Sequence, residues 1–224
     1  MSPPPFERAV AWATYEGRMR DAIHAFKYGR LKPAARPLGY MLADAIKQLA
    51  TDAPAELLVV PVPLHSSKQA SRGFNQARLL AVHALAALHK SHPAWHLKLA
   101  SAVLLRQRAT ESQAGLTPRQ RRINLRHAFR VSDPALVTGK DVLVVDDILT
   151  TGATARAAAR TLLRAGAQSI WVATLARARH AYFTRSIAAA HELRGPMPGQ
   201  ASPPQFVPQP PIARMYSQDQ PSFE

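Results

Sequence analysis

The chain has 224 residues, of which 47% are hydrophobic and 19% are charged, a composition typical of a folded protein with one sizeable core. It contains no cysteine, which excludes disulfides, thiolate metal sites and a cysteine nucleophile. The formal net charge of +15 arises within the first 180 residues, because residues 181–224 hold three arginines and three acids. Such an excess favours polyanionic ligands or partners, although an arginine-rich proteome would also produce it.

The chain divides into three parts by composition. Residues 1–14 are proline-rich and then apolar, and we expect a loosely ordered lead-in without the apolar core of a signal peptide. Residues 15–180 are expected to form the folded domain. Residues 181–224 are rich in proline and glutamine, cannot bury enough apolar surface to offset their ordering entropy, and are expected to be disordered. No apolar run is long enough to cross a bilayer, so we expect no membrane insertion and a cytoplasmic location.

The first half of the domain shows a helical pattern and then a strand. Apolar residues at helical spacing predict one helix from Tyr15 to Gly29 and another from about Leu38 to Leu49. The apolar run at residues 57–60 predicts a buried parallel strand, and the two prolines that follow it stiffen a loop at residues 61–68. A helix is then expected from Ser71 to about Leu88.

The second half continues the alternation. Residues 89–96 are expected to be a loop or short element, and residues 103–105 a short strand. A strand at residues 142–145 precedes a helix at residues 155–163, and a last strand of mixed polarity at residues 169–175 is expected towards the sheet edge. This alternation predicts an α/β fold with a parallel sheet and helices on both faces.

One stretch carries most of the chemical information. The β-branched apolar run at residues 142–145 is typical of a strand covered on both faces. Asp146 and Asp147 follow it at the strand's C-terminal end, where open α/β sheets place ligands. Residues 150–154 then supply hydroxyls and backbone N–H groups at the positive end of a helix dipole. The pattern favours a ribose phosphate as ligand; the alternative is a turn in which these residues only cap the helix.

This stretch resembles the phosphoribosyl-pyrophosphate (PRPP) motif of type I phosphoribosyltransferases, in which four apolar residues and two acids precede a Thr-Thr-Gly-Ala-Thr loop. The resemblance implies that Asp146 and Asp147 hold the ribose hydroxyls at the catalytic position. It implies that the 5′-phosphate is bound by Thr150, Thr151, Gly152, Ala153 and Thr154. Mg²⁺ is implied as a cofactor that arrives with PRPP, near the two aspartates, rather than as an ion held by the protein alone.

In the same enzymes the loop after the first core strand binds the pyrophosphate. Residues 61–68 take this place in the chain, and Lys68 and Arg72 are the candidate partners for the pyrophosphate charge. The alternative, that both are solvated surface charges, stays open.

Residues 106–130 carry seven arginines and one acid. Type I phosphoribosyltransferases have at this place a flexible hood that closes over the reacting centre and excludes water. Such a segment is also suited to the phosphates of single-stranded DNA. The candidate DNA contacts are Arg106, Arg119, Arg121, Arg122 and Arg126.

Further pieces narrow the resemblance to the ComF family, whose phosphoribosyltransferase-like proteins are linked to competence for DNA uptake. They are residues 15–17, 26–28, 61–65 and 72–76, the spacing within residues 106–129, and the PRPP motif. The resemblance implies a type I phosphoribosyltransferase-like sheet of about five strands, a small hood, and competence proteins as partners. Many members carry an N-terminal zinc ribbon with paired cysteines. This chain has none, so it is a short form or lacks an upstream segment, and zinc binding is not carried over.

Two functions follow. The first is a ComF-like protein that binds PRPP and Mg²⁺ and transfers 5-phosphoribosyl to an acceptor that the sequence does not identify. The second is a non-enzymatic accessory factor of DNA uptake that senses PRPP or binds nucleic acid. A glutamine amidotransferase is excluded because the N-terminal cysteine nucleophile is absent. A receiver domain is excluded because its acidic pair follows the first strand.

Overall fold

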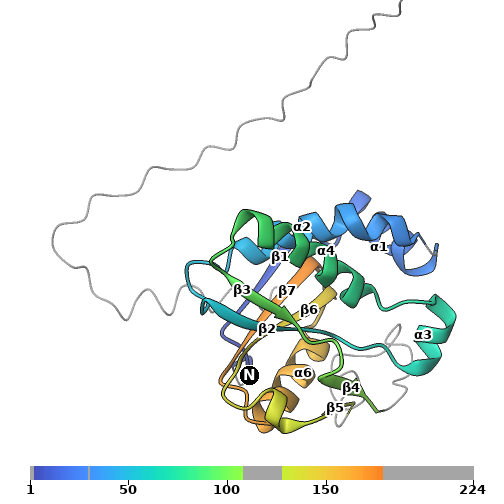
Figure 1. The fold of residues 1–224 in the computed structure, drawn as a ribbon. Helices are drawn as coiled ribbons and strands as arrows, with labels where there is room; N and C mark the ends of the chain where they lie inside the picture. The colour runs from blue at the N-terminus through green and yellow to red at the C-terminus, as the bar shows by residue number, and fades with distance from the viewer. Residues whose placement is uncertain (1–2, 30, 108–127, 179–224) are drawn as a thin grey trace, which may run out of the picture. The chain divides into compact units, whose positions relative to one another are not determined.

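Five parallel strands form the central sheet of this computed structural model, which describes residues 3–29, 31–107 and 128–178. They lie side by side in the order β1-β7-β6-β2-β3 (Figure 1). Their bounds are β1 Arg8–Thr14, β2 Glu56–Pro61, β3 His96–Leu99, β6 Asp141–Leu149 and β7 Ser169–Arg177. The prediction of a parallel α/β sheet is confirmed.

Helices cover both faces of this sheet, with α2 and α4 on one side and α6 on the other (Figure 1). The first face carries a core that α1, α2 and α4 share with β1, β2, β6 and β7. The helices are α1 Gly17–Tyr28, α2 Ala35–Lys47, α3 Ser66–Arg72, α4 Gln76–Ser91 and α6 Ala153–Arg164, with short 3₁₀ turns η1 Lys32–Ala34 and η2 Pro134–Leu136.

β6 is the centre of the fold. It pairs with β2 on one side and β7 on the other, and residues 142–145 are fully buried. A strand covered on both faces needs a continuous apolar run rather than an alternating one, which is what these residues supply. The strand extends further than the sequence suggested, so that Asp146 and Asp147 lie within it and not after it.

The N-terminal part of the chain differs from the prediction. Residues 1–14 were expected to be a loosely ordered lead-in, but β1 pairs in parallel with β7, and Val10 is only 5% exposed. The prolines at residues 3–5 indicated a loosely ordered segment, so the strand that follows them was not predicted. Because β1 takes the edge position, β7 lies inside the sheet, and its predicted place near the edge is wrong for the same reason.

Two other elements also differ. The helix expected from Ser71 is α4, which begins only at Gln76, and a separate helix, α3, starts within the predicted loop at residues 61–68. Gly73 adopts a left-handed conformation (φ 76°) that ends α3. Asn75 then caps α4, its side-chain oxygen accepting a hydrogen bond from the Arg78 backbone N–H at 3.0 Å. β3 begins at His96, the last residue of the segment expected to be a loop or short element, and no strand was predicted there.

The expected short strand near residue 104 pairs with a partner to form a second, two-stranded antiparallel sheet. It consists of β4 Leu104–Arg106 and β5 Phe129–Val131. The predicted hood between these strands, and the predicted tail at residues 181–224, lie outside the described residues. Within the described ranges, no helix has both the length and the apolar character that crossing a bilayer requires.

The edge strand provides a test of the corrected fold. Val10→Asp should lower the free energy of unfolding by about 3 kcal/mol, because it buries an unpaired charge between β1 and the core. Thr14→Asp, at an exposed position of the same strand, should change it by less than about 0.5 kcal/mol. Urea unfolding measures both, and equal effects would mean that β1 is not part of the folded sheet.

Candidate active site

The two aspartates lie on β6 just beyond its apolar centre, on opposite faces of the sheet, because successive side chains of a strand alternate. Asp147 shares its face with Leu143 and Val145, which belong to the core beneath α1, α2 and α4. It is 8% exposed. Asp146 is turned to the other face, where part of the residue is exposed although its carboxyl group lies among protein atoms. The strand therefore presents one carboxylate to each layer of the fold.

A lysine of α1 compensates the buried charge of Asp147. The Lys27 Nζ lies 2.9 Å from Asp147 Oδ1, and the two side chains are only 17% and 12% exposed. An ion pair so far removed from water is held by attraction that solvent screens weakly, and breaking it would leave an uncompensated buried charge. Lys27 thus fixes the position of the Asp147 side chain.

Asp146 titrates near neutrality. Burial, and then the neighbouring charge of Asp147, raise the pKa of the Asp146 carboxyl to about 7. Lys27, the Asp147 backbone N–H and Arg106 act in the opposite direction. That N–H donates to Asp146 Oδ1 at 2.9 Å. The carboxyl therefore keeps its proton to a higher pH than an ordinary aspartate, and a cation or hydroxyl that requires the carboxylate must displace that proton.

The loop after β6 leads into α6 through a left-handed glycine. Gly152 (φ 70°) is the N-cap of this 12-residue helix and contributes no side chain to the cap. The N–H groups of the first helical turn therefore lack a side-chain acceptor. Thr151 Oγ1 is buried and has no hydrogen-bond partner among the residues that the structure describes. An anion at this helix start would find both unpaired donors and a favourable dipole.

Positive side chains from three elements gather near one another. Burial, and then repulsion from Arg106, Arg72 and Lys27, lower the pKa of the Lys68 ammonium. The cations of α1, α3 and β4 are therefore close enough to Lys68 to repel it. The structure thus brings the predicted residue Lys68 near Lys27 and Arg106, the two cations that act on the aspartates.

Arg72 is fixed by α1. Its guanidinium donates to Tyr28 Oη at 3.3 Å and lies 5.1 Å from the centre of the Tyr28 ring. It also donates to Gln76 Oε1 at 3.3 Å. α1 therefore touches the site twice, through Lys27 and through Tyr28.

Sequence reasoning missed these two α1 residues as part of the site. Residues 26–28 entered the sequence analysis as a helix ending and as part of the family resemblance, but no role at the site was assigned to them. No local pattern indicates that residue 27 meets residue 147, since this contact depends on how α1 packs over the sheet.

The arginine-rich segment is described only at its two ends. Arg106, on β4, lies with its guanidinium carbon 5.4 Å from the centre of the Phe129 ring on β5, and it interacts electrostatically with Asp146. Arg130 is exposed on β5. The other predicted DNA contacts, Arg119, Arg121, Arg122 and Arg126, lie outside the described residues.

The donor set fits a magnesium ion shared with a ligand. Asp146 and Asp147 offer hard carboxylate oxygens, and Mg²⁺ is usually held by one or two carboxylates together with substrate phosphates and water. The described residues include no cluster of three or more acidic, histidine or cysteine side chains that would hold a metal by themselves.

Comparison with known proteins supports the assignment of a phosphoribosyltransferase-like α/β fold. The family model described as "Phosphoribosyl transferase domain" matches residues 75–190, which include both aspartates and the Thr/Gly loop. The DNA utilization protein YhgH of Salmonella typhi is 36% identical over 177 residues, covering 78% of this chain and 74% of that protein. YhgH of Escherichia coli K12 is 35% identical over 178 residues, with the same coverage. Competence protein F of Haemophilus influenzae is 29% identical over 184 residues, covering 78% and 75%.

The ion pair between α1 and β6 can be measured by a double-mutant cycle. Lys27→Met should lower the free energy of unfolding by about 2 kcal/mol, and adding Asp147→Asn should restore part of it, giving a coupling of about 1–3 kcal/mol. The control is the pair Lys47–Asp44, at 2.8 Å but with side chains 39% and 58% exposed, whose coupling should stay below about 0.5 kcal/mol. Equal coupling in both cycles would contradict a structural role for Lys27.

Proposed function

The chain belongs to the ComF family of phosphoribosyltransferase-domain proteins, and from this premise we propose that it binds PRPP together with Mg²⁺ at the end of β6. The observation that carries the proposal is the pair Asp146–Asp147 directly before an anion-favouring loop, with cations on both sides. We further propose that the protein acts in the cytoplasm.

Each part of PRPP has a matching part of the site. The carboxylates of Asp146 and Asp147 accept hydrogen bonds from the ribose hydroxyls. The backbone of residues 150–154 and the unpaired Thr151 hydroxyl bind the 5′-phosphate. Lys68 and Arg72 bind the pyrophosphate, and the loop that follows β2 supports them. This arrangement spans the start of α6 and the start of α3, both at the C-terminal end of the sheet.

Charge is the second argument. Lys27 and Arg106 act on the two aspartates, and Lys68 is repelled by both of these cations and by Arg72. Burial and then this repulsion lower the pKa of the Lys68 ammonium, and a bound polyanion would relieve the repulsion. Mg²⁺, when bound, would neutralise pyrophosphate charge and make that group easier to displace.

Transfer of the 5-phosphoribosyl group is the reaction that such binding would serve. The bond from ribose C1 to pyrophosphate breaks, a bond from C1 to the acceptor forms, and the acceptor's proton leaves with the pyrophosphate. The chain's own contribution is to hold the ribose, to place ionised carboxylate near the positive charge that develops on it, and to position the leaving group with cations.

A second candidate function is non-enzymatic. The relatives are named as a DNA utilization protein and as competence proteins, names that describe no transfer reaction. In this alternative, PRPP is a signal and the excess of arginine contacts single-stranded DNA in an accessory role in DNA uptake, together with other competence proteins.

Binding is tested by calorimetry with PRPP and Mg²⁺. Asp146→Asn/Asp147→Asn should weaken PRPP binding at least tenfold, since both carboxylates are lost, whereas Asp21→Asn/Asp44→Asn removes two exposed carboxylates and should leave it unchanged. Because the Asp146 carboxyl must lose its proton, the wild-type dissociation constant should fall about tenfold from pH 6 to pH 8 and then level off. Equal affinity in both double variants would refute the site.

Turnover is tested separately by following pyrophosphate release from PRPP and Mg²⁺ with a panel of bases and amines. Release that depends on one acceptor, and is lost in Asp146→Asn/Asp147→Asn, is the result expected of a transferase. Intact binding without release from any member of the panel would favour the accessory role.

A further inference from the structure

Residues 72–76 form the turn between α3 and α4, and the PRPP assignment above uses only the first of them. Arg72 is the last residue of α3, which the left-handed Gly73 (φ 76°) brings to an end. Asn75 caps α4, and Gln76 is the first residue of that helix. Because one helix ends and the next begins within so short a stretch, the backbone that carries Arg72 is fixed on both sides of the turn.

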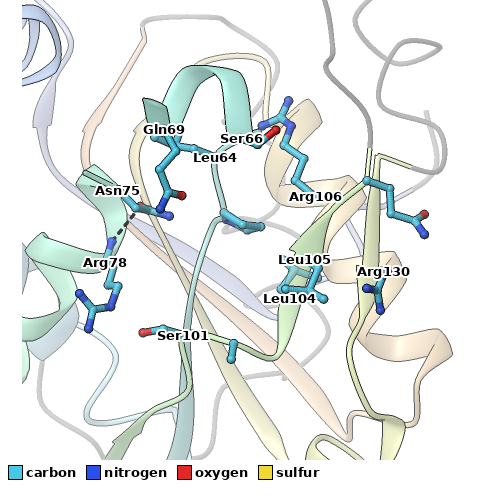
Figure 2. Close-up of a pocket in the computed structure, with 13 residues that line it drawn as sticks. Leu64, Ser66, Gln69, Asn75, Arg78, Ser101, Leu104, Leu105, Arg106 and Arg130 are labelled. Carbon is cyan, nitrogen blue, oxygen red and sulfur yellow. Dashed lines mark hydrogen bonds between the residues drawn. The ribbon is translucent and has the colours of Figure 1, made fainter. Parts of the chain in front are cut away.

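The turn is anchored to α1 and to the loop after β2. The Phe74 side chain is buried against α1, with its ring centre 5.3 Å from that of Phe26. The Asn75 amide donates to the Val62 carbonyl oxygen at 3.1 Å, within the loop assigned to pyrophosphate. Asn75 also lines the pocket of about 730 Å³ that this loop borders (Figure 2). The turn is thus held between α1 and the pyrophosphate loop.

Within the described chain, every hydrogen bond of the Arg72 guanidinium goes to a neutral acceptor. Its Nη1 donates to Gln76 Oε1 at 3.3 Å, and its Nη2 donates to Tyr28 Oη at 3.3 Å. The Tyr28 ring lies beside the same group, with its centre 5.1 Å away. No salt bridge among the described residues includes Arg72. The side chain is therefore held in place while its positive charge is not neutralised, and its other N–H donors stay available.

Gln76 is the most informative member of this arrangement. The residue is 1% exposed, and its Nε2 has no hydrogen-bond partner among the described residues. An unpaired buried amide lowers stability, and an apolar side chain would avoid that cost. A glutamate would offer the same acceptor oxygen, but it would form an ion pair with Arg72 and cancel the charge. Glutamine is the side chain that provides the acceptor and leaves the guanidinium charge free.

We propose that Gln76 and Tyr28 are positioning residues, which hold the Arg72 guanidinium for the pyrophosphate group of PRPP and leave its charge available to that group. The inference rests on the PRPP site proposed above and adds to it two residues that touch Arg72 rather than the ligand. Lys68, on the same helix, is repelled by Arg72, and no salt bridge in the described ranges neutralises either cation. Two neighbouring free cations match a group with several negative oxygens.

Calorimetry on the full chain in Mg²⁺ tests the proposal with two probes, inorganic pyrophosphate and ribose 5-phosphate. Gln76→Glu should weaken pyrophosphate binding at least tenfold, because the new carboxylate pairs with Arg72, and should leave ribose 5-phosphate binding within twofold. Tyr28→Phe should weaken pyrophosphate binding about threefold, since the ring remains and one acceptor is lost. A merely structural role would weaken the binding of both probes alike.

Two matched variants serve as controls. Gln48→Glu makes the same change of side chain at an exposed position at the end of α2. Tyr40→Phe removes the hydroxyl of a similar pair on α2, where Arg36 Nε donates to Tyr40 Oη at 3.0 Å and the guanidinium lies 5.8 Å from the ring centre. Both should leave the binding of both probes within twofold.

A second measurement needs no ligand. In an Arg72→Met background, Gln76→Glu should lower the melting temperature by about 5 °C or more, because the buried carboxylate then has no counter-charge. In the wild-type background the same change should lower it by less than about 2 °C. Equal shifts in the two backgrounds would show that the side chain at position 76 does not act on Arg72, and would overturn the proposal.

The outcomes separate this inference from the proposed function. Pyrophosphate binding that survives Gln76→Glu overturns the positioning role, as does an equal loss of both probes. A wild-type chain that binds pyrophosphate but not ribose 5-phosphate refutes the ribose-phosphate cradle and leaves the positioning role standing. A wild-type chain that binds neither probe refutes both.

Discussion

Two adjacent carboxylates on one central strand impose the main constraint on this structure. Consecutive side chains of β6 point to opposite faces, and burying two neighbouring carboxylates requires nearby positive charge. Lys27 of α1 forms the ion pair with Asp147 and also acts on Asp146, to which Arg106 of β4 contributes further. The N-terminal helix and the antiparallel ribbon therefore meet at one point of the sheet, although they lie far apart in the sequence.

The site contains more positive charge than the two carboxylates alone would neutralise. Lys68 and Arg72 add further charge from α3, and repulsion from Arg106, Arg72 and Lys27 adds to burial in lowering the pKa of Lys68. A site with unpaired hydrogen-bond donors, a partly protonated acid and surplus cations lowers the stability of the empty protein. A polyanion that pairs with those donors and cations would raise the free energy of unfolding, so we expect ligand binding and folding stability to be linked.

Much of this arrangement was encoded locally and some of it was not. The run at residues 142–145, the acids after it and the glycine before α6 are contiguous, and their order alone predicted the strand, the turn and the helix. β1 was missed because pairing at a sheet edge depends on a partner more than 150 residues away, and its flanking prolines suggested disorder. The same holds for Lys27: a helix-terminal lysine has one sequence pattern whether it meets water or a buried aspartate. Gly73 ended α3 through a backbone conformation that the helical pattern alone did not reveal.

The edge position of β1 also affects how the chain is made. Among the described strands its only partner is β7, and the contact between Thr174 and Val10 spans 164 residues. At typical translation rates of about 5–20 residues per second, β1 waits on the order of ten seconds after its own synthesis for the strand it must join. During that time its sheet edge towards β7 is unpaired. The nascent chain is thus exposed to aggregation at β1 until β7 has been made.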